Sequence, residues 1–297
     1  MITTLQNQQS TFSQTISDAI AQQGIANSFN PSIGYFHDSI YVAFRGQAKG
    51  KGKPFDAFLL VIDRQASHQL INLSDKATAF GIEPVADPKL VTLNNELWMT
   101  FNTGWDEGNN KIYLWKIAPT LEKPLECLYK DRQAVEKNWG FFSENNQIMC
   151  LYDVSKGLIL QATDQPLSDD TIEFTTLSQI RSNSQLQSFT LGTQPLKING
   201  AYYLIAHKKI SLFKKRLYLG RLVSFTFNNQ SIKKLEVSKR LLAHSFKSLF
   251  GSPIKHNKNL ISCTYFSGML NHEDSILLSY GINDVDFNIV ELSKESL

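Results

Sequence analysis

The segment Asn30–Gly46 reads NPSIGYFHDSIYVAFRG. It begins with Asn-Pro, continues through a short apolar stretch, reaches polar residues at His37-Asp38, and ends in the apolar run Ser39–Phe44. Apolar and polar residues alternate along that run, which places one face of a β-strand inward. The segment therefore predicts a β-hairpin whose second strand is well buried.

The same pattern recurs along the chain. It is found again as DPKLVTLNNELWMTFNT from Asp87, NWGFFSENNQIMCLYDV from Asn138 and TQPLKINGAYYLIAHKK from Thr193, at intervals of 57, 51 and 55 residues. The pairs Asn94-Asn95, Asn145-Asn146 and Asn199-Gly200 suit two-residue hairpin loops, which need positive φ angles. A further strand is expected after three of the hairpins, at Asp56–Val61, Lys111–Ile117 and Leu219–Phe227.

The last unit has two candidate starts. GSPIKHNKNLISCTYF from Gly251 and SGMLNHEDSILLSYGIND from Ser267 both have the shape of the repeat, so one of them is an insertion. We favour Ser267, because Asp284 and the run Phe287–Leu292 then complete the unit. A repeat of about 50–60 residues with three or four strands is typical of a β-propeller blade.

The predicted fold is all-β: one five-bladed β-propeller domain spanning residues 1–297. Residues 1–28 form a cap that contains a short amphipathic helix over Gln9–Gln23. The blades are expected at roughly 29–85, 86–135, 136–190, 191–250 and 251–297.

Composition excludes several classes of protein. Of the 297 residues 42% are hydrophobic and 19% charged, and the net charge is only +3, so neither disorder nor nucleic-acid binding is expected. The three cysteines fit neither a disulfide framework nor a zinc site. We expect no metal and no cofactor. No secretory signal or apolar stretch of membrane-spanning length is visible, which favours a cytoplasmic protein without transmembrane segments.

Inner strands of a propeller line a central channel, so polar residues near their ends converge there although they are far apart in sequence. Aromatic residues at Trp98, Trp105, Trp139 and Tyr280 offer faces on which sugar rings can stack. The basic run of Lys208, Lys209, Lys214, Lys215 and Arg216 is interpreted first as a solvated hairpin loop, and alternatively as a site for an anionic glycan, a nucleotide sugar or a membrane-associated acceptor. The candidate site residues are Asn30, Arg45, Asp87, Lys89, Lys137, Asn138, Asp153, His207, Arg221 and Asp284.

Several of these segments resemble five-bladed carbohydrate-active propellers, most closely glycoside hydrolase family 130, the β-mannoside phosphorylases and hydrolases. The resemblance spans residues 30–292, and two of its segments also resemble propeller domains found beside bacterial polysaccharide glycosyltransferases. The segments are N-P-S-I…F-R (Asn30–Arg45), E-P-V-A-D-P-K (Glu83–Lys89), K-N-W (Lys137–Trp139), G-T-Q-P (Gly192–Pro195) and S-Y-G-I-N-D (Ser279–Asp284).

The resemblance implies roles for individual residues. Asp87 is the implied catalytic acid, which protonates the leaving group. Related arabinanase and invertase propellers carry a catalytic carboxylate where this chain has Asn30, so their two-carboxylate mechanism is disfavoured. The implied binding residues are Arg45 and Lys89 for substrate or anion, His207 and Arg221 for the acceptor or phosphate, and Asp284 for sugar hydroxyls.

The chain departs from the family pattern where Lys89 replaces an arginine. Lysine lacks the planar fork with which arginine holds phosphate, and this weakens the case for phosphorolysis. The leading hypothesis is an enzyme that cleaves or forms a glycosidic bond of a mannoside-like sugar, with an oligosaccharide and possible phosphate or nucleotide-sugar partners. The alternative is a non-catalytic glycan-binding propeller in bacterial polysaccharide biosynthesis. A third hypothesis is a protein-interaction propeller.

Overall fold

The protein was analysed as a computed structural model, which describes residues 2–8, 10–48, 55–104, 109–163, 169–212, 215–251 and 258–296. The described chain is mostly β-strand, as predicted, and its strands form three sheets. The first sheet is four-stranded and contains β2 (Ile25–Phe36), β3 (Ser39–Ala48), β4 (Asp56–Ile62) and β5 (His68–Asn72). In order along the chain, each of these strands pairs antiparallel with the next.

The second sheet joins two such antiparallel runs. β13 pairs parallel with β9 and connects them. The first run is β6 (Ala86–Leu93), β7 (Glu96–Asn102), β8 (Ile112–Ala118) and β9 (Leu125–Tyr129); the second is β10 (Gly140–Glu144), β11 (Gln147–Asp153), β12 (Leu158–Ala162) and β13 (Thr171–Ser178).

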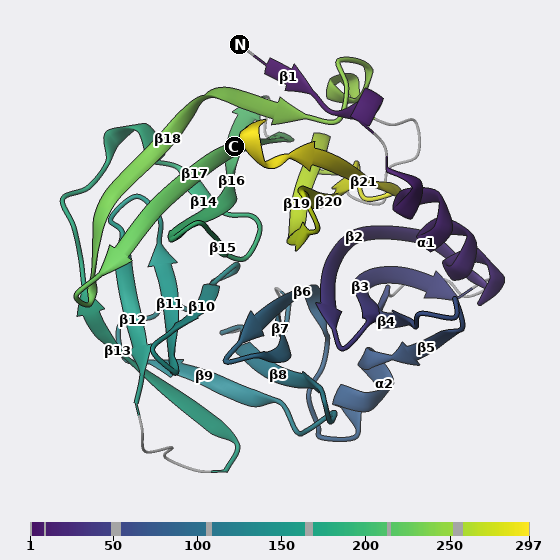
Figure 1. Cartoon of the computed structure of the whole chain (residues 1–297), viewed down its shortest axis with the longest axis horizontal. Helices are drawn as coiled ribbons and strands as arrows, with labels where there is room; N and C mark the ends of the chain where they lie inside the picture. Colours follow the sequence, from purple (N-terminus) through teal and green to yellow (C-terminus); the bar gives the residue numbers. More distant parts are fainter. Residues whose placement is uncertain are drawn as a thin grey trace.

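The third sheet likewise joins two runs, because β17 pairs parallel with β19. The first run is β14 (Phe189–Leu191) and β15 (Leu196–Ile198), both paired with β16 (Ala201–Leu212), then β17 (Lys215–Asn228) and β18 (Ser231–Ala243). The second is β19 (Leu260–His272), β20 (Ser275–Ile282) and β21 (Asp286–Ser293). All the runs follow one another around a common centre in chain order (Figure 1).

The predicted hairpin turns are confirmed by their backbone angles. Asn94 and Asn95 have φ of 49° and 64°, Asn145 and Asn146 have 51° and 61°, and Asn199-Gly200 has 49° and 84°. Two successive positive φ angles are what a type I′ turn requires. At the C-terminal end the strands agree with the unit that starts at Ser267. A turn at Glu273-Asp274 joins β19 to β20, and β21 completes the run.

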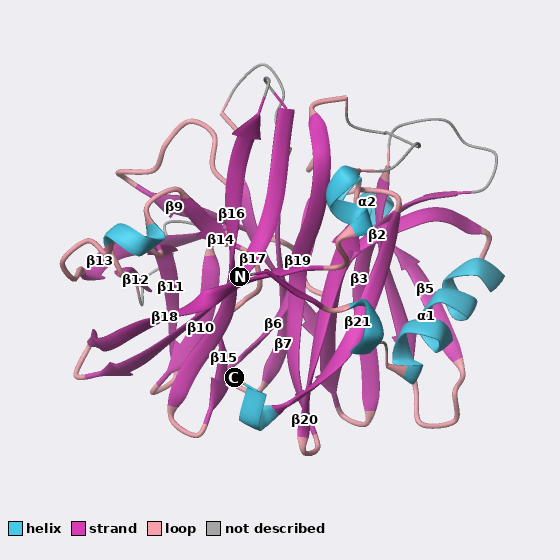
Figure 2. Cartoon of the chain, turned by 90° about the horizontal axis from the view of Figure 1, so that it is seen from above, coloured by secondary structure: helices cyan, strands magenta, loops and turns pink. Residues whose placement is uncertain are grey.

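The N-terminal segment links the last strands of the chain to the first. β1 (Ile2–Thr4) pairs parallel with β18, and the hydroxyl of Ser13 donates to Asn288 Oδ1 of β21 at 2.9 Å. The predicted helix is present as α1 (Thr11–Gln22), which buries Ile16 and Ile20 on the flank of the molecule (Figures 1 and 2). A second helix, α2 (Leu73–Thr78), follows β5. Neither helix is long and apolar enough to cross a membrane.

Aromatic side chains pack between neighbouring runs of strands. Phe142 of β10 lies 4.7 Å from Tyr202 of β16 and 5.8 Å from Phe225 of β17, measured between ring centres. Trp139, which was a candidate for stacking on sugar, is only 2% exposed and packs 5.9 Å from Phe174. Most of the aromatic residues of the sequence therefore serve the core.

Side-chain hydrogen bonds connect the inner strands across the centre. The Ser32 hydroxyl on β2 accepts from the backbone N–H of Leu90 on β6 at 2.8 Å, and Gln194 Oε1 accepts from Phe141 of β10 at 2.7 Å. Ser279 of β20 donates to the carbonyl of Pro31 at 2.7 Å. These bonds join different runs of strands to one another, and so help to position the groups at the strand ends.

Candidate active site

A cavity of about 440 Å³ lies at one end of the inner strands. Residues from β2, β3, β6, β14, β16, β17 and β19 line it, together with the segment before β10 and the turn between β20 and β21. These elements surround the centre of the molecule in Figure 1. The predicted site residues on its wall are Asn30, Arg45, Asp87, Lys137, Asn138, His207 and Asp284.

Three of these residues share an unusual backbone conformation. Asn30, Asp87 and Asn138 have φ of 53°, 50° and 62°, a region that Asn and Asp tolerate better than most residues. Strand pairing shifts register at the first two, between Phe29 and Ser32 and between Ala86 and Lys89. Such bulges redirect side chains and often lie beside functional sites. The repeated N-P, D-P and N-W dipeptides thus encode the bends that turn these side chains toward the cavity.

Asp87 is the centre of a cluster of charges. Its Oδ1 lies 3.8 Å from Nη1 of Arg45 and its Oδ2 3.6 Å from Nζ of Lys137, while its side chain is 11% exposed. Burial acts to raise the pKa of Asp87, but the charges of Lys137, Arg45 and Lys89 outweigh it and the pKa is lowered. Asp87 is therefore ionised at neutral pH, so it would have to gain a proton before it could act as the expected proton donor.

Lys89 lies beneath this cluster and is 1% exposed. Its Nζ donates to Asn138 Oδ1 at 2.7 Å and to the carbonyl of Gly192. Tyr265 donates to the same Asn138 oxygen at 3.0 Å. Burial lowers the pKa of Lys89 to about 7, against the attraction of Asp87. The ammonium is engaged in these contacts between inner strands, and Lys89 does not line the cavity of about 440 Å³.

His207 is a buried, neutral imidazole. It has no exposed surface, and its Nε2 accepts from the backbone N–H of Phe266 at 2.8 Å, which assigns the ring proton to Nδ1. Burial and the charge of Lys89 lower its pKa to about 3. His207 thus presents a donor and carries no charge at neutral pH.

Asp284 occupies the turn between β20 and β21. Asn283 and Asp284 have φ of 54° and 56°, and Asn283 is fixed by two bonds to Cys263, N–H to carbonyl at 2.8 Å and Oδ1 from N–H at 2.7 Å. Burial, and then the negative charge of Asp87, raise the pKa of Asp284 to about 6 against the nearby cations. The cavity therefore contains two carboxyl groups with opposite pKa shifts.

Unpaired polar atoms gather at the same cavity. Asn30 Oδ1, Arg45 Nε and His207 Nδ1 are buried and have no hydrogen-bond partner among the described residues. In the described chain only Ser178 Oγ and His272 Nδ1 share this property, and both lie elsewhere. Buried polar groups are normally paired, so a cluster of exceptions calls for an explanation. A polar ligand provides one.

Besides Lys89, two predicted residues do not line this cavity. Asp153 Oδ1 accepts from the N–H and the hydroxyl of Ser155 at 2.8 and 2.7 Å, so it stabilises the turn after β11. It lines a second cavity of about 360 Å³, which shares Lys137, Asn138, Val135 and Thr190 with the first. Arg221 is one strand further out, opposite Ala206, and its Nε donates to the carbonyl of Ser238. Its expected place on the acceptor side is not supported by this position.

Sequence patterns missed several residues on the wall. Tyr218 and Tyr265 are its aromatic residues, whereas Trp98 and Tyr280 pack elsewhere and Trp105 lies outside the described residues. Lys209 and Arg216 also line the cavity. They belong to the basic run, for which an anion site was the alternative to a solvated loop, so charge was the available signal.

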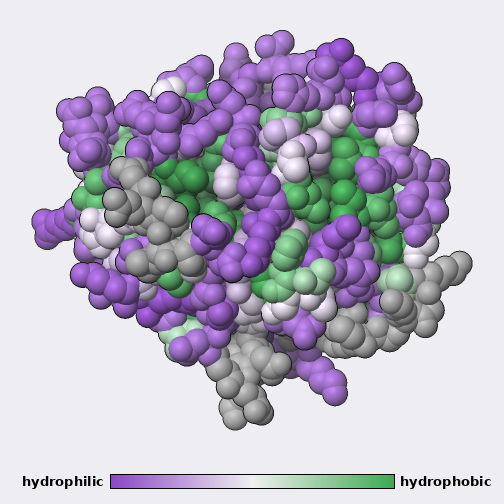
Figure 3. Space-filling model, turned by 90° about the horizontal axis from the view of Figure 1, so that it is seen from below, coloured by the Kyte–Doolittle hydropathy of each residue, from purple (hydrophilic) through white to green (hydrophobic). Residues whose placement is uncertain are grey.

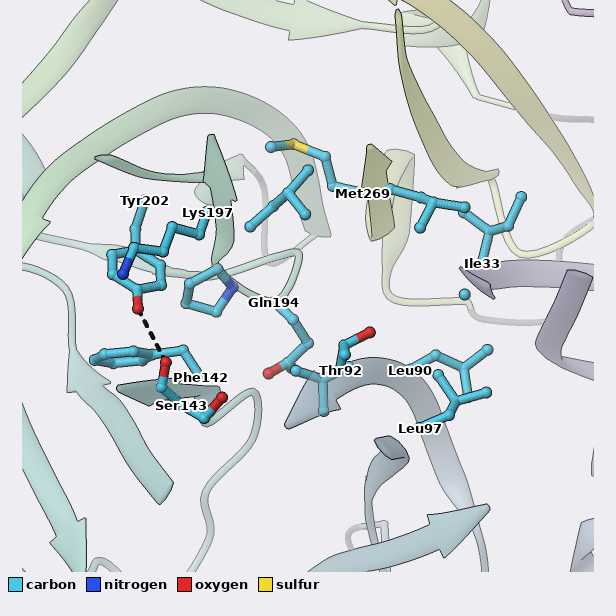
Figure 4. A pocket seen from close by; sticks show the side chains of 15 residues that line it. Ile33, Leu90, Thr92, Leu97, Phe142, Ser143, Gln194, Lys197, Tyr202 and Met269 are labelled. Carbon is cyan, nitrogen blue, oxygen red and sulfur yellow. Dashed lines mark hydrogen bonds between the residues drawn. The ribbon is translucent and has the colours of Figure 1, made fainter. Parts of the chain in front are cut away.

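The opposite end of the inner strands has a different character. A cavity of about 260 Å³ there is lined by Ile33, Leu90, Leu97, Met269 and other residues that lie further along the same strands (Figure 4). Its polar groups include Ser143 and Tyr202, which are joined by a hydrogen bond of 3.1 Å. This cavity has Lys197 on its wall, whereas the ion pairs of Asp87 and the unpaired atoms of Asn30, Arg45 and His207 lie at the first cavity.

The fold is similar to that of solved glycoside hydrolases and phosphorylases. One match is a structure from the GH130 family of mannoside phosphorylases, a family that contains glycoside hydrolases that target β-1,2-mannosidic linkages in Candida mannan. Its TM-score is 0.62 and its sequence identity is 12%, and the match covers 90% of this chain and 84% of that one. The β-1,2-mannobiose phosphorylase of Listeria innocua matches with a TM-score of 0.58 and 11% identity, over 92% of this chain and 91% of that one.

A thermostable family-43 glycoside hydrolase matches with a TM-score of 0.51 and 14% identity, over 90% of this chain and 89% of that one. No protein-family model matches the chain, and no curated protein matches it either. The structural matches support the predicted resemblance to family 130 at the level of the fold.

Proposed function

We propose that this chain is a five-bladed propeller enzyme that cleaves or forms a glycosidic bond of a mannoside-like sugar in the cavity at Asp87. The blades correspond to the runs β2–β5, β6–β9, β10–β13, β14–β18 and β19–β21. Support for a carbohydrate substrate comes from the chemistry of the cavity and from similar folds that act on mannosides.

The cluster of unpaired groups around Asp87 carries this proposal. A sugar hydroxyl both donates and accepts, so it can pair with the acceptor Asn30 Oδ1 and with the donors His207 Nδ1 and Arg45 Nε. Glycosidic cleavage develops positive charge at the anomeric carbon, and the ionised carboxylate of Asp87 can stabilise that charge. We therefore keep Asp87 as a catalytic residue, with an electrostatic role in place of proton donation.

The second cavity supports a substrate longer than one sugar. It adjoins the first through Lys137 and Asn138, and its wall contains the polar residues Gln133, Ser155 and Ser188. A chain of sugars that has one unit beside Asp87 can extend into it. The first cavity also contains Lys209 and Arg216, which suit inorganic phosphate or the phosphate of a nucleotide sugar as a second reactant.

A non-catalytic glycan-binding propeller of polysaccharide biosynthesis is the second candidate. The buried position of Lys89, where the family has arginine, favours it, because one phosphate-binding group is then unavailable. A protein-interaction propeller is less well supported. The large apolar side chains exposed in the described chain are only Tyr35, Phe80, Phe246 and Phe250, and on the face in Figure 3 hydrophilic side chains surround smaller hydrophobic patches.

Turnover and binding of β-1,2-mannobiose separate these candidates. Wild-type protein is incubated with the disaccharide in water and in phosphate, released mannose or mannose phosphate is quantified, and affinity is measured by calorimetry. We expect Asp87→Asn to abolish turnover and to retain most of the affinity. Asp38→Asn is the matched control, because Asp38 pairs with Arg64 on an exposed hairpin. Binding without turnover by the wild type favours the second candidate, and unchanged turnover in Asp87→Asn refutes the role of Asp87.

A further inference from the structure

We propose that Asp284 is the acid that protonates the departing sugar oxygen. This inference rests on the glycosidic-bond chemistry proposed above and assigns the proton to a residue for which only contact with sugar hydroxyls was expected.

The two carboxylates have different neighbours although they line one cavity. Asp87 has a cation on each side, Arg45 at 3.8 Å and Lys137 at 3.6 Å. Within the described part of the chain, the carboxylate of Asp284 has no ion pair and no hydrogen bond. A carboxyl without such partners is free to donate its proton to a substrate atom, whereas protonation of Asp87 would discard two favourable charge interactions.

Charged and titratable groups face Asp284 from every element around it. Asp87 on β6 is the negative neighbour and raises the pKa, in the same direction as burial. The cations Arg45 on β3, Lys137 before β10 and Arg216 on β17 oppose this. Tyr218 on β17 and Cys263 on β19 complete the surroundings.

The net effect is a pKa of about 6 for Asp284, while that of Asp87 is lowered. Two neighbouring carboxyl groups whose pKa values diverge in this way are the usual arrangement of an acid and an ionised partner in glycosidases.

The turn that bears Asp284 is held firmly enough for such a role. Its preceding residue, Asn283, exchanges two hydrogen bonds with Cys263 of β19, and the Asn283 side chain also reaches the carbonyl of Ser248 at 3.4 Å. The backbone that carries Asp284 is thereby fixed relative to β19, one of the strands that line the cavity. Proton transfer requires this kind of fixed geometry.

The step balances without a further reagent in the hydrolytic direction. The proton of the Asp284 carboxyl moves to the glycosidic oxygen as the bond between that oxygen and the anomeric carbon breaks, and the bonding electron pair stays with the oxygen. Water adds to the anomeric carbon, whose developing positive charge is faced by the carboxylate of Asp87. The proton that water loses passes to solvent, from which Asp284 is protonated again.

Leaving-group dependence tests this assignment. The probes are 2,4-dinitrophenyl β-mannoside, whose leaving group needs no proton, and methyl β-mannoside, whose leaving group does. We expect Asp284→Asn to lower kcat/KM about 10²- to 10⁴-fold for the methyl glycoside and less than about tenfold for the dinitrophenyl glycoside. Asp87→Asn should lower both to a similar extent. Asparagine tolerates the positive φ of position 284, and circular dichroism checks that each variant folds.

The pH profile provides a second readout, which a merely structural role would not change. Because the acid must be protonated, wild-type kcat/KM for the methyl glycoside should fall as pH rises through about 6, and this limb should vanish in Asp284→Asn. If Asp284→Asn lost kcat/KM equally on both glycosides and kept the fall of kcat/KM near pH 6, the assignment of Asp284 would be overturned and the proposed function would stand. A wild type that turns over neither these probes nor β-1,2-mannobiose, in water or in phosphate, overturns both the assignment and the proposed function.

Discussion

The guanidinium of Arg45, at the end of β3, lies 3.8 Å from the carboxylate of Asp87 on β6, which belongs to the next run of strands. Two aromatic rings hold the guanidinium, with the centres of Phe29 and Phe55 at 5.5 and 5.9 Å from its central carbon. The ion pair thus joins two runs of strands and has a preorganised cation. The Nε–H of Arg45 has no hydrogen-bond partner among the described residues and lies at the cavity.

Removal of this cation should change both charge and activity. In Arg45→Met the pKa of Asp87 should rise, because one of the two flanking cations is lost while burial remains. We expect kcat/KM to fall about 10²-fold or more, as after removal of a preorganised electrostatic partner. Initial rates on β-1,2-mannobiose from pH 4 to 9 measure the effect. Arg64→Met is the control, since Arg64 pairs with Asp38 on the surface; equal losses in the two variants would contradict the prediction.

Lys89 makes stability depend on pH in a defined direction. Its pKa is lowered from 10.5 in the unfolded chain to about 7 in the fold, so the unfolded chain binds more protons between these values. Stability therefore rises with pH from about 7 to 10.5, and the burial penalty is present in full below 7. Lys89→Met should flatten this slope in urea unfolding experiments at pH 7, 8 and 9. An unchanged slope in the variant would show that Lys89 is not the source.

His207 should remain neutral throughout the range in which the enzyme is assayed. Burial is the main cause of its pKa of about 3, and the acceptor role of Nε2 fixes the Nδ1–H tautomer. In ¹⁵N-labelled protein we expect the ring nitrogens of His207 to show that tautomer with no titration between pH 5 and 8. His207→Gln identifies the signals by their loss. Titration near pH 6.5 would mean that the ring is exposed or charged, against the geometry described.

The backbone of Gly281 determines where Asn30 lies. A Cβ at position 281 would stand 1.8 Å from Asn30 Oδ1, so Gly281→Ala must displace that side chain. We expect lower stability and weaker binding of β-1,2-mannobiose. Asn30→Gly removes Oδ1 and Cγ from this contact, leaves the backbone N of residue 30 at 2.9 Å, and suits the positive φ at position 30, so the double variant should recover part of the stability lost in Gly281→Ala. Additive losses of stability in the cycle would rule out this contact as the cause.

Local patterns were sufficient to predict the hairpins and many of the residues that line the cavity. The dipeptides at Asn30, Asp87 and Asn138 recur at a fixed place in the repeat, and their positive φ angles explain why those residue types stand there. Repeat position alone was less informative for Lys89 and Arg221. Lys89 does not line the cavity because its side chain is buried below it. Arg221 does not line the cavity because it lies on β17, one strand further from the centre than β16.

The tyrosines and the charge states needed three-dimensional contacts. Tyr218 and Tyr265 resemble the other aromatic residues of alternating strands, and nothing local marks them as cavity residues. The opposite pKa shifts of Asp87 and Asp284 arise from which cations surround each carboxyl. Residues from three strands, β3, β6 and β17, and from the segment before β10 contribute to that difference, so a repeat pattern cannot predict it.

The position of bound β-1,2-mannobiose tests the central claim most directly. A crystal structure of Asp87→Asn with the disaccharide should show one sugar ring in the cavity of about 440 Å³, in contact with position 87 and Asp284. Its hydroxyls should pair with Asn30 Oδ1 and His207 Nδ1. A disaccharide bound in the apolar cavity at the other end of the inner strands, or absent from both cavities at saturating concentration, would contradict the account.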